Sequence, residues 1–146
     1  FSEIFNRNFL TTFNTIKSIL PQMKKNKKGT IITVGSTNAL INSKNEFAYS
    51  ISKNSIIKMT KILAKDLKDF NISVNCICPG PTKTSRFMFT SKQRKKEELA
   101  FLHKKTGLNR AAEMDEISII VNMLTQKKAR FITGQIIAID GGVSLE

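Results

Sequence analysis

The chain has 146 residues, of which 40% are hydrophobic and 24% charged, and this is the composition of a folded domain rather than a disordered segment. Its net charge of +13 comes mostly from lysines spread along the chain, which argues against a nucleic-acid-binding face. No apolar run approaches the roughly 20 residues of a membrane-spanning helix and no secretory signal is visible, so we expect a cytoplasmic protein that binds no membrane.

The first half of the chain predicts a helix, a strand and a loop. Apolar residues recur at helical spacing over residues 2–24, which predicts an amphipathic helix. A polar turn at residues 24–29 leads to a β-rich run at residues 30–34, which predicts a buried strand. Residues 35–46 are rich in Gly, Ser, Thr and Asn and predict a loop.

A second helix is predicted over residues 47–70, because an apolar stripe and a lysine stripe lie nearly opposite each other on a helical projection. The apolar stripe is Ile56, Met59, Leu63 and Leu67, and the lysine stripe is Lys58, Lys61, Lys65 and Lys68. Residues 72–78 predict a second buried strand, which a Pro-Gly-Pro turn closes at residues 79–81.

The rest of the chain predicts one more helix and one more strand. A lysine-rich region at residues 82–108 precedes a short helix at 115–125 and a last strand at 135–139. Helices alternating with buried, non-alternating strands indicate an α/β fold with three parallel strands and right-handed crossovers. Such a sheet binds its ligand beyond the carboxyl ends of its strands, here near Ser36 and Gly80.

The two cysteines lie two positions apart on the second predicted strand. Cys76 and Cys78 therefore share a face at about 6.5 Å, the far edge of what a disulfide spans. We expect buried, reduced thiols. A metal site is not expected, because His103 is the only histidine and there is no second cysteine pair.

One pair on the second helix is a candidate for acid–base chemistry. Tyr49 and Lys53 are four residues apart, so they lie on one face of the helix, next to its apolar stripe. Lys53 therefore points toward the protein, where a charged amine needs a partner or a purpose. A cation beside a phenol favours the phenolate and makes the phenol a better proton donor. The pair alone is a common pattern in lysine-rich helices.

The spacing of several motifs makes the chemistry more specific. Ser36 ends the first strand thirteen positions before Tyr49, so its hydroxyl can face the same crevice. Here the sequence resembles the short-chain dehydrogenase/reductase family, and its 3-oxoacyl-acyl-carrier-protein reductase branch most closely. The matching stretches are residues 29–36, 49–53, 74–80, 108–117 and 132–142.

The resemblance implies a fold and a set of catalytic residues. The fold would be the C-terminal portion of a Rossmann-type doubly wound parallel sheet, with residues 1–146 forming a partial NAD(P)-binding domain. Tyr49 would protonate a carbonyl oxygen as a hydride arrives, and Lys53 would make Tyr49 more acidic. Ser36 would stabilise the developing alkoxide, and Asn8 would anchor a proton-relay water.

The resemblance also implies a cofactor, a substrate class and partners. Tyr49 and Lys53 would contact NAD or NADP, with NADP the usual choice of this branch. Pro79 and Gly80 would let the backbone approach the nicotinamide, and Thr84 or Thr82 would contact its carboxamide. The substrate would be a small or acyl-carrier-bound carbonyl compound, and the protein would form a homodimer or tetramer.

Residues 82–108 match the region that covers the substrate in this family. An apolar cluster there, Phe87-Met88-Phe89 with Leu99 and Phe101, would exclude water as a mobile lid. The same cluster is equally compatible with the packing of a surface helix.

The Gly-rich cofactor turn of the family has no counterpart in the sequence. We therefore expect the chain to match the C-terminal half of the family, with weak dinucleotide binding on its own and an uncovered edge at the strand of residues 30–34. Two other hypotheses stay open: a truncated, inactive remnant or interaction module, and a basic nucleic-acid binder with strongly salt-dependent affinity.

Overall fold

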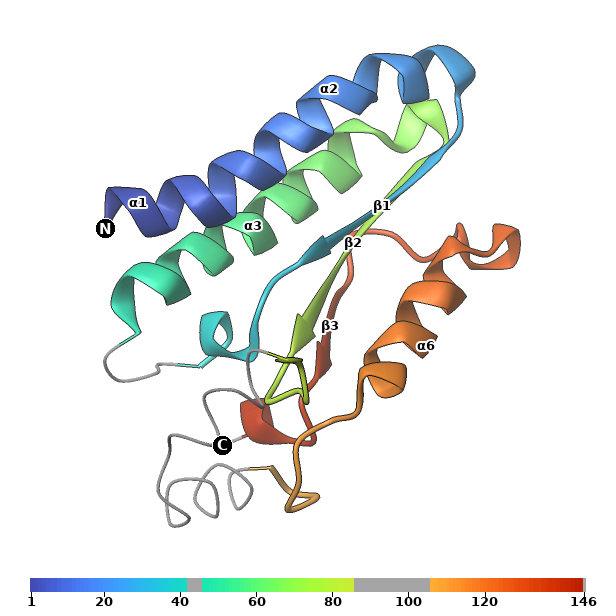
Figure 1. The fold of residues 1–146 in the computed structure, drawn as a ribbon. Coiled ribbons are helices and arrows are strands. Elements are labelled where there is room, and N and C mark those ends of the chain that lie inside the picture. Colours follow the sequence, from blue (N-terminus) through green and yellow to red (C-terminus); the bar gives the residue numbers. More distant parts are fainter. Residues whose placement is uncertain (42–45, 86–105, 146) are drawn as a thin grey trace.

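The computed structural model describes residues 1–41, 46–85 and 106–145, and within them a parallel sheet lies between helices on its two faces (Figure 1). Helices α2 and α3 run side by side over one face, and α6 lies on the other. The α/β class predicted from the sequence is confirmed.

The sheet has three strands in the order β1-β2-β3, all parallel. They are β1 (Gly29–Val34), β2 (Ile72–Pro79) and β3 (Ile136–Ile139). The central strand β2 is buried from Ile72 to Cys78, as its continuous apolar sequence predicts. Because the strands are parallel, their carboxyl ends meet at one edge of the sheet.

The first helix is longer than predicted and is interrupted. It consists of α1 (Ser2–Phe5), a π-helical turn η1 (Asn6–Leu10) and α2 (Thr11–Asn26). Lys27 ends it in the left-handed conformation, with φ of 46°, and its N–H bonds back to the carbonyl of Lys24. The apolar period does not distinguish a π turn from an α turn, so the sequence could not predict η1.

The second helix, α3 (Phe47–Asp66), presents the two stripes that its sequence predicts. Ile56 and Leu67 are each only 1% exposed, whereas the four lysines of the opposite stripe are exposed. The helix ends four residues earlier than predicted, and a 3₁₀ turn, η3 (Lys68–Phe70), continues it. Asn71, with φ of 53°, then reverses the chain into β2.

The buried side chains on this face of the sheet form two clusters. One lies under α2 and α3 and contains Ile16, Ile31, Ala64, Leu67, Ile72 and Val74. The other lies nearer the carboxyl ends of the strands and contains Ile56, Ile57, Cys76 and Cys78. The second cluster lies directly beneath the candidate site, because its two thiols pack under Gly35.

The remaining helix, α6 (Met114–Thr125), begins with a capping box in which Glu113 and Glu116 each bond the other's backbone N–H. None of the helices in the described ranges is long and apolar enough to cross a membrane. Those ranges also contain no group of three His, Cys, Asp or Glu side chains that could hold a metal ion.

Candidate active site

A cavity of about 400 Å³ opens at the carboxyl ends of β1 and β2. Its lining residues are Val34, Gly35, Ser36, Tyr49, Lys53, Pro79, Gly80, Pro81, Thr82 and Thr84. Every site residue predicted from the sequence therefore lines this one cavity, with the exception of Asn8. Three separate segments supply them: the loop after β1, the first turns of α3, and the end of β2 with the loop that follows it.

Tyr49 and Lys53 lie on the same face of α3, as their spacing predicts. The Nζ atom of Lys53 is 5.8 Å from the centre of the Tyr49 ring and donates a 2.9 Å hydrogen bond to the carbonyl of Val34. Partial burial lowers the pKa of Lys53, while the nearby thiols Cys76 and Cys78 raise it to a smaller extent. The amine is thus held between α3 and the end of β1, within reach of the cavity.

Ser36 lines the cavity directly after Gly35, whose backbone lies close to two thiols. A Cβ at Gly35 would lie 2.7 Å from Cys78 Sγ and 3.0 Å from Cys76 Sγ, so only glycine fits without a shift. Ser36 then begins a 3₁₀ turn, η2 (Thr37–Ala39), and its Oγ accepts a hydrogen bond from the Asn38 N–H at 3.3 Å.

The two cysteines beneath this loop are free and fully buried, with their Sγ atoms 3.9 Å apart. They share a face of β2, as predicted. The hydrogen bond with Cys76, together with burial, raises the pKa of the Cys78 thiol. The pair therefore fills the space under Gly35 as small apolar groups.

The loop after β2 approaches the end of β3 closely. A Cβ at Gly80 would lie 2.8 Å from both Cα and Cβ of Asp140, and the Gly80 N–H donates to the carbonyl of Ile139. The hydroxyl of Thr82 turns back to donate to the Gly80 carbonyl at 2.9 Å. This leaves the Pro79–Gly80 backbone as part of the cavity wall, where a flat ligand can come close to it.

Asn8 does not line the cavity. It lies in the π turn η1, where its Nδ2 donates to the carbonyl of Ile4 at 2.9 Å. Single π turns inside α-helices occur frequently at functional sites. The proton-relay role of Asn8 stays a prediction.

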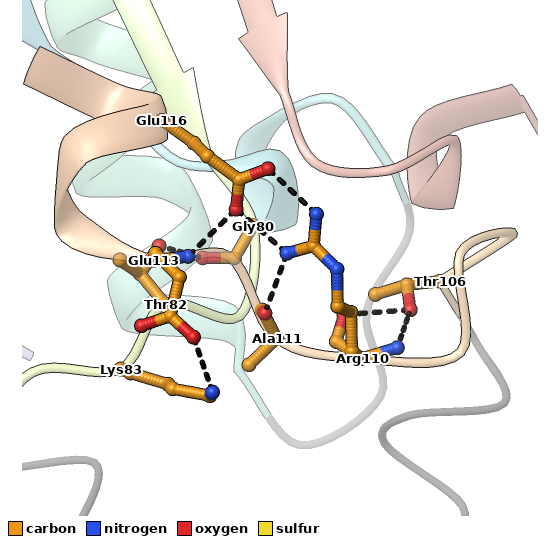
Figure 2. Close-up of polar contacts among 8 residues, drawn as sticks. All are labelled: Gly80, Thr82, Lys83, Thr106, Arg110, Ala111, Glu113 and Glu116. Carbon is orange, nitrogen blue, oxygen red and sulfur yellow. Dashed lines mark hydrogen bonds and ion pairs between the residues drawn. The ribbon is translucent and has the colours of Figure 1, made fainter.

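A set of polar contacts that the sequence analysis missed lies beside the cavity (Figure 2). Arg110 makes two 2.6 Å hydrogen bonds to the carboxylate of Glu116, and these hold the pKa of Glu116 down to about 2. Lys83 pairs with Glu113, and a short parallel bridge joins Thr82 to Ala112.

These contacts tie the segment after β2 to the start of α6. The Glu-x-x-Glu spacing of the capping box was a signal available in the sequence, but nothing there pointed to its arginine and lysine partners. The predicted lid residues Phe87, Met88, Phe89, Leu99 and Phe101 lie outside the described residues.

Comparisons with known proteins find similar sequences along nearly the whole chain. A family model described as enoyl-(acyl carrier protein) reductase matches residues 1–144. The 3-oxoacyl-acyl-carrier-protein reductase FabG of Buchnera aphidicola (subsp. Acyrthosiphon pisum) is 32% identical over 97% of this chain and 56% of its own length. Dehydrogenase/reductase SDR family member 6 of Rattus norvegicus is 34% identical over 96% of this chain and 58% of its own. The chain thus spans about half the length of the curated relatives it matches.

Solved structures of related proteins have the same fold as this chain. A 3-oxoacyl-acyl-carrier-protein reductase from Brucella melitensis superposes with a TM-score of 0.87 and 29% identity, over 95% of this chain and 51% of that one. An oxidoreductase of the short-chain dehydrogenase/reductase family from Burkholderia thailandensis gives 0.88 and 27%, over 97% and 55%. With a family model that covers nearly the whole chain and this fold, the chain belongs to the short-chain dehydrogenase/reductase family.

Proposed function

We propose that the protein is an oxidoreductase that reduces a carbonyl group, or oxidises the matching alcohol, with NADH or NADPH. One observation carries the proposal: Tyr49, Lys53 and Ser36 come from two different segments and line one cavity at the carboxyl ends of the strands. A phenol, an amine and a hydroxyl around one space are the groups needed to deliver a proton to a carbonyl oxygen.

The residues around the cavity fit the nicotinamide end of a dinucleotide. Lys53 offers a half-buried cationic donor, and Gly80 has no side chain between its backbone and the cavity, since a Cβ there would clash with Asp140. The volume of about 400 Å³ falls in the range of small-molecule sites. Tyr49, Lys53, Pro79, Gly80, Thr82 and Thr84 would hold this group. When bound, it supplies the hydride.

In this mechanism Tyr49 donates its phenolic proton to the substrate oxygen. Lys53, 5.8 Å from the Tyr49 ring, stabilises the phenolate that is left. Ser36 donates a hydrogen bond to the oxygen as its negative charge develops. Asn8, one helix away, would orient a water that returns a proton toward Lys53.

The substrate class rests on the relatives. The relative from Buchnera aphidicola and the structure from Brucella melitensis are both described as 3-oxoacyl-acyl-carrier-protein reductases. We therefore propose a 3-oxoacyl thioester, free or carrier-bound, as the substrate. A solved structure 25% identical to this chain is described as an NADPH-dependent reductase, which favours NADPH. Two buried reduced thiols fit a cytoplasmic setting.

We also propose that the protein is a homo-oligomer. An apolar groove of about 450 Å³ lies between α2 and α3, and its walls include Phe13, Leu20, Met59 and Leu63. An exposed apolar surface of this kind is a common contact between copies of a chain.

The test is a comparison of Tyr49→Phe with the wild type in the full-length protein, using a 3-oxoacyl thioester and NADPH. Removal of a general acid lowers kcat by roughly 10²–10⁴-fold, so we expect a loss of at least about 100-fold, with the thermal melting curve unchanged. The matched control is Lys58→Met on the exposed stripe of α3, which should keep its rate.

Tyr49→Phe variants with wild-type kcat would contradict the proposed chemistry. A wild-type protein with no turnover and no dinucleotide binding in a fluorescence titration would instead support the alternative of an inactive remnant.

A further inference from the structure

The side chain of Asp140 connects segments that follow all three strands. It lies directly after β3 and is only 8% exposed. Its Oδ1 accepts the Gly142 N–H at 3.0 Å and its Oδ2 accepts the Ser144 N–H at 3.0 Å, which fixes the carboxylate within the turn that follows β3. Its own Cα and Cβ pack against Gly80, in the loop after β2.

The same carboxylate also reaches the loop after β1. Oδ2 accepts a hydrogen bond from the hydroxyl of Thr37 at 3.3 Å, across 103 positions of sequence. Thr37 is 2% exposed, so water does not compete for this contact. Thr37 immediately follows Ser36 in the chain.

The turn that carries Ser36 is held at its start by the backbone of Gly35 and at its far end by Ala39. Just before η2, the Gly35 N–H donates to the Ile77 carbonyl at 2.8 Å. At the far end of η2, the Asn54 side chain donates to the Ala39 carbonyl at 3.1 Å, and Ala39 packs on the second core cluster. A single 3₁₀ turn is not stable without tertiary contacts. Among the residues that the structure describes, the hydrogen bond between Thr37 and Asp140 joins the residue directly after Ser36 to the end of β3.

We propose that Asp140 is a positioning residue for the reaction: through Thr37 it fixes the place of Ser36 on the cavity wall. The proposal rests on the proposed function, because it assigns Ser36 a task in that chemistry. A misplacement of about 1 Å in a catalytic group can lower the rate by around 100-fold, so one hydrogen bond behind Ser36 matters to turnover.

The direct test is Thr37→Val in the full-length protein, since valine has the shape of threonine without its hydroxyl. We expect kcat to fall by about tenfold or more with KM within twofold, because only the placement of Ser36 changes. Amide hydrogen exchange provides a second readout that needs no turnover. The Asn38 amide, which Ser36 Oγ holds, should exchange at least about tenfold faster.

Two further variants separate positioning from general stability. Thr37→Ser keeps the hydroxyl and should restore both kcat and the slow exchange of Asn38. Ser73→Ala removes another buried hydroxyl, which donates to that of Thr30 at 3.4 Å near the amino ends of β1 and β2, at the opposite end of the strands from Ser36. It should lower the melting temperature and leave kcat and Asn38 exchange unchanged.

The carboxylate is tested with Asp140→Asn, in which an amide replaces one acceptor oxygen. If Asp140 acts through Thr37, the double variant Thr37→Val/Asp140→Asn should lose no more kcat than the worse single variant. Losses that multiply would show independent effects and would overturn the proposal.

The proposal is also overturned if Thr37→Val changes only one of the two readouts, or neither, while Tyr49→Phe still loses its activity. That result would leave the proposed function intact. If Tyr49→Phe keeps its rate, the proposed function fails and the task assigned to Ser36 fails with it. Asn38 exchange then reports only whether the tether exists.

Discussion

At the scale of single residues, Lys53 is where charge and burial oppose each other most directly. Burial places its folded-state pKa below that of the unfolded chain, so the unfolded chain binds the proton more tightly. The free energy of unfolding should therefore rise with pH between the lowered pKa and 10.5. Below that window, the charged amine weakens the fold.

Replacement of Lys53 should consequently stabilise the protein while it removes activity. For Lys53→Met, the free energy of unfolding at pH 7 should rise by roughly 0.5–1 kcal/mol, after allowance for partial solvent screening. The reason is that an apolar side chain fits the half-buried position. The gain should shrink as the pH approaches 10.5, the ordinary value for lysine. Urea unfolding at several pH values measures it. Lys58→Met, on the exposed face, should change stability by less than about 0.5 kcal/mol; an equal gain there would contradict the explanation.

The sequence predicted contacts between residues at a regular helical spacing, and it did not predict contacts between residues far apart in the chain. Tyr49 and Lys53 could be found because positions four apart share a helix face. Thr37 and Asp140 meet across 103 positions, with no period or local motif to pair them. Such contacts depend on how the three strands pack together in the fold, and the pattern of a single sequence does not show that arrangement.

At the scale of elements, the start of α6 is held by the ion pair between Arg110 and Glu116. Glu116 has its pKa lowered to about 2, so this pair stabilises the folded state fully above the ordinary carboxyl pKa of 4.5. The contribution is lost as the pH falls from 4.5 toward 2. Salt screens it, because both side chains are largely exposed.

Glu116→Gln should therefore be less stable than the wild type at pH 7, and the difference should shrink as the pH falls from 4.5 toward 2. We expect the melting temperature at pH 7 to fall by a few degrees, with a smaller difference in 1 M salt. Calorimetry across this pH range checks the expectation. Glu3→Gln, an exposed carboxylate at the start of α1, is the matched control. A difference for Glu116→Gln that does not shrink between pH 4.5 and pH 2 would contradict the assignment to charge.

The sequence predicted these elements well where their pattern was strong. The apolar runs of β1 and β2 gave their bounds to within one residue, and the two stripes of α3 gave its orientation. The π turn η1 and the early end of α3 were missed, since both depend on backbone hydrogen bonding that side-chain periodicity does not report.

At the scale of the whole molecule, β1 is an edge strand of the three-stranded sheet. Within the described part of the chain, β1 pairs only with β2, and Val34 at its end is 49% exposed. An unpaired strand edge with an apolar side chain is a template for association.

The 146-residue chain expressed alone should consequently self-associate through β1. Val34→Lys should shift the population toward monomer in sedimentation velocity, because a charged side chain on an edge strand opposes pairing. The control is Phe131→Lys, since Phe131 is fully exposed but lies just before β3, at the opposite edge of the sheet. Dissociation by Phe131→Lys and not by Val34→Lys would place the contact at the other edge.

The central strand β2 pairs with one strand that precedes it in the sequence, β1, and with one that follows it, β3. The Asn75 side chain accepts the N–H of Gln135, which is made 60 residues later. A ribosome that adds about 5–20 residues per second leaves a delay of roughly 3–12 s before this contact can form. For that time the nascent chain carries an apolar strand with one side open, so we expect its yield in cells to depend on translation speed and on chaperones that bind newly made chains.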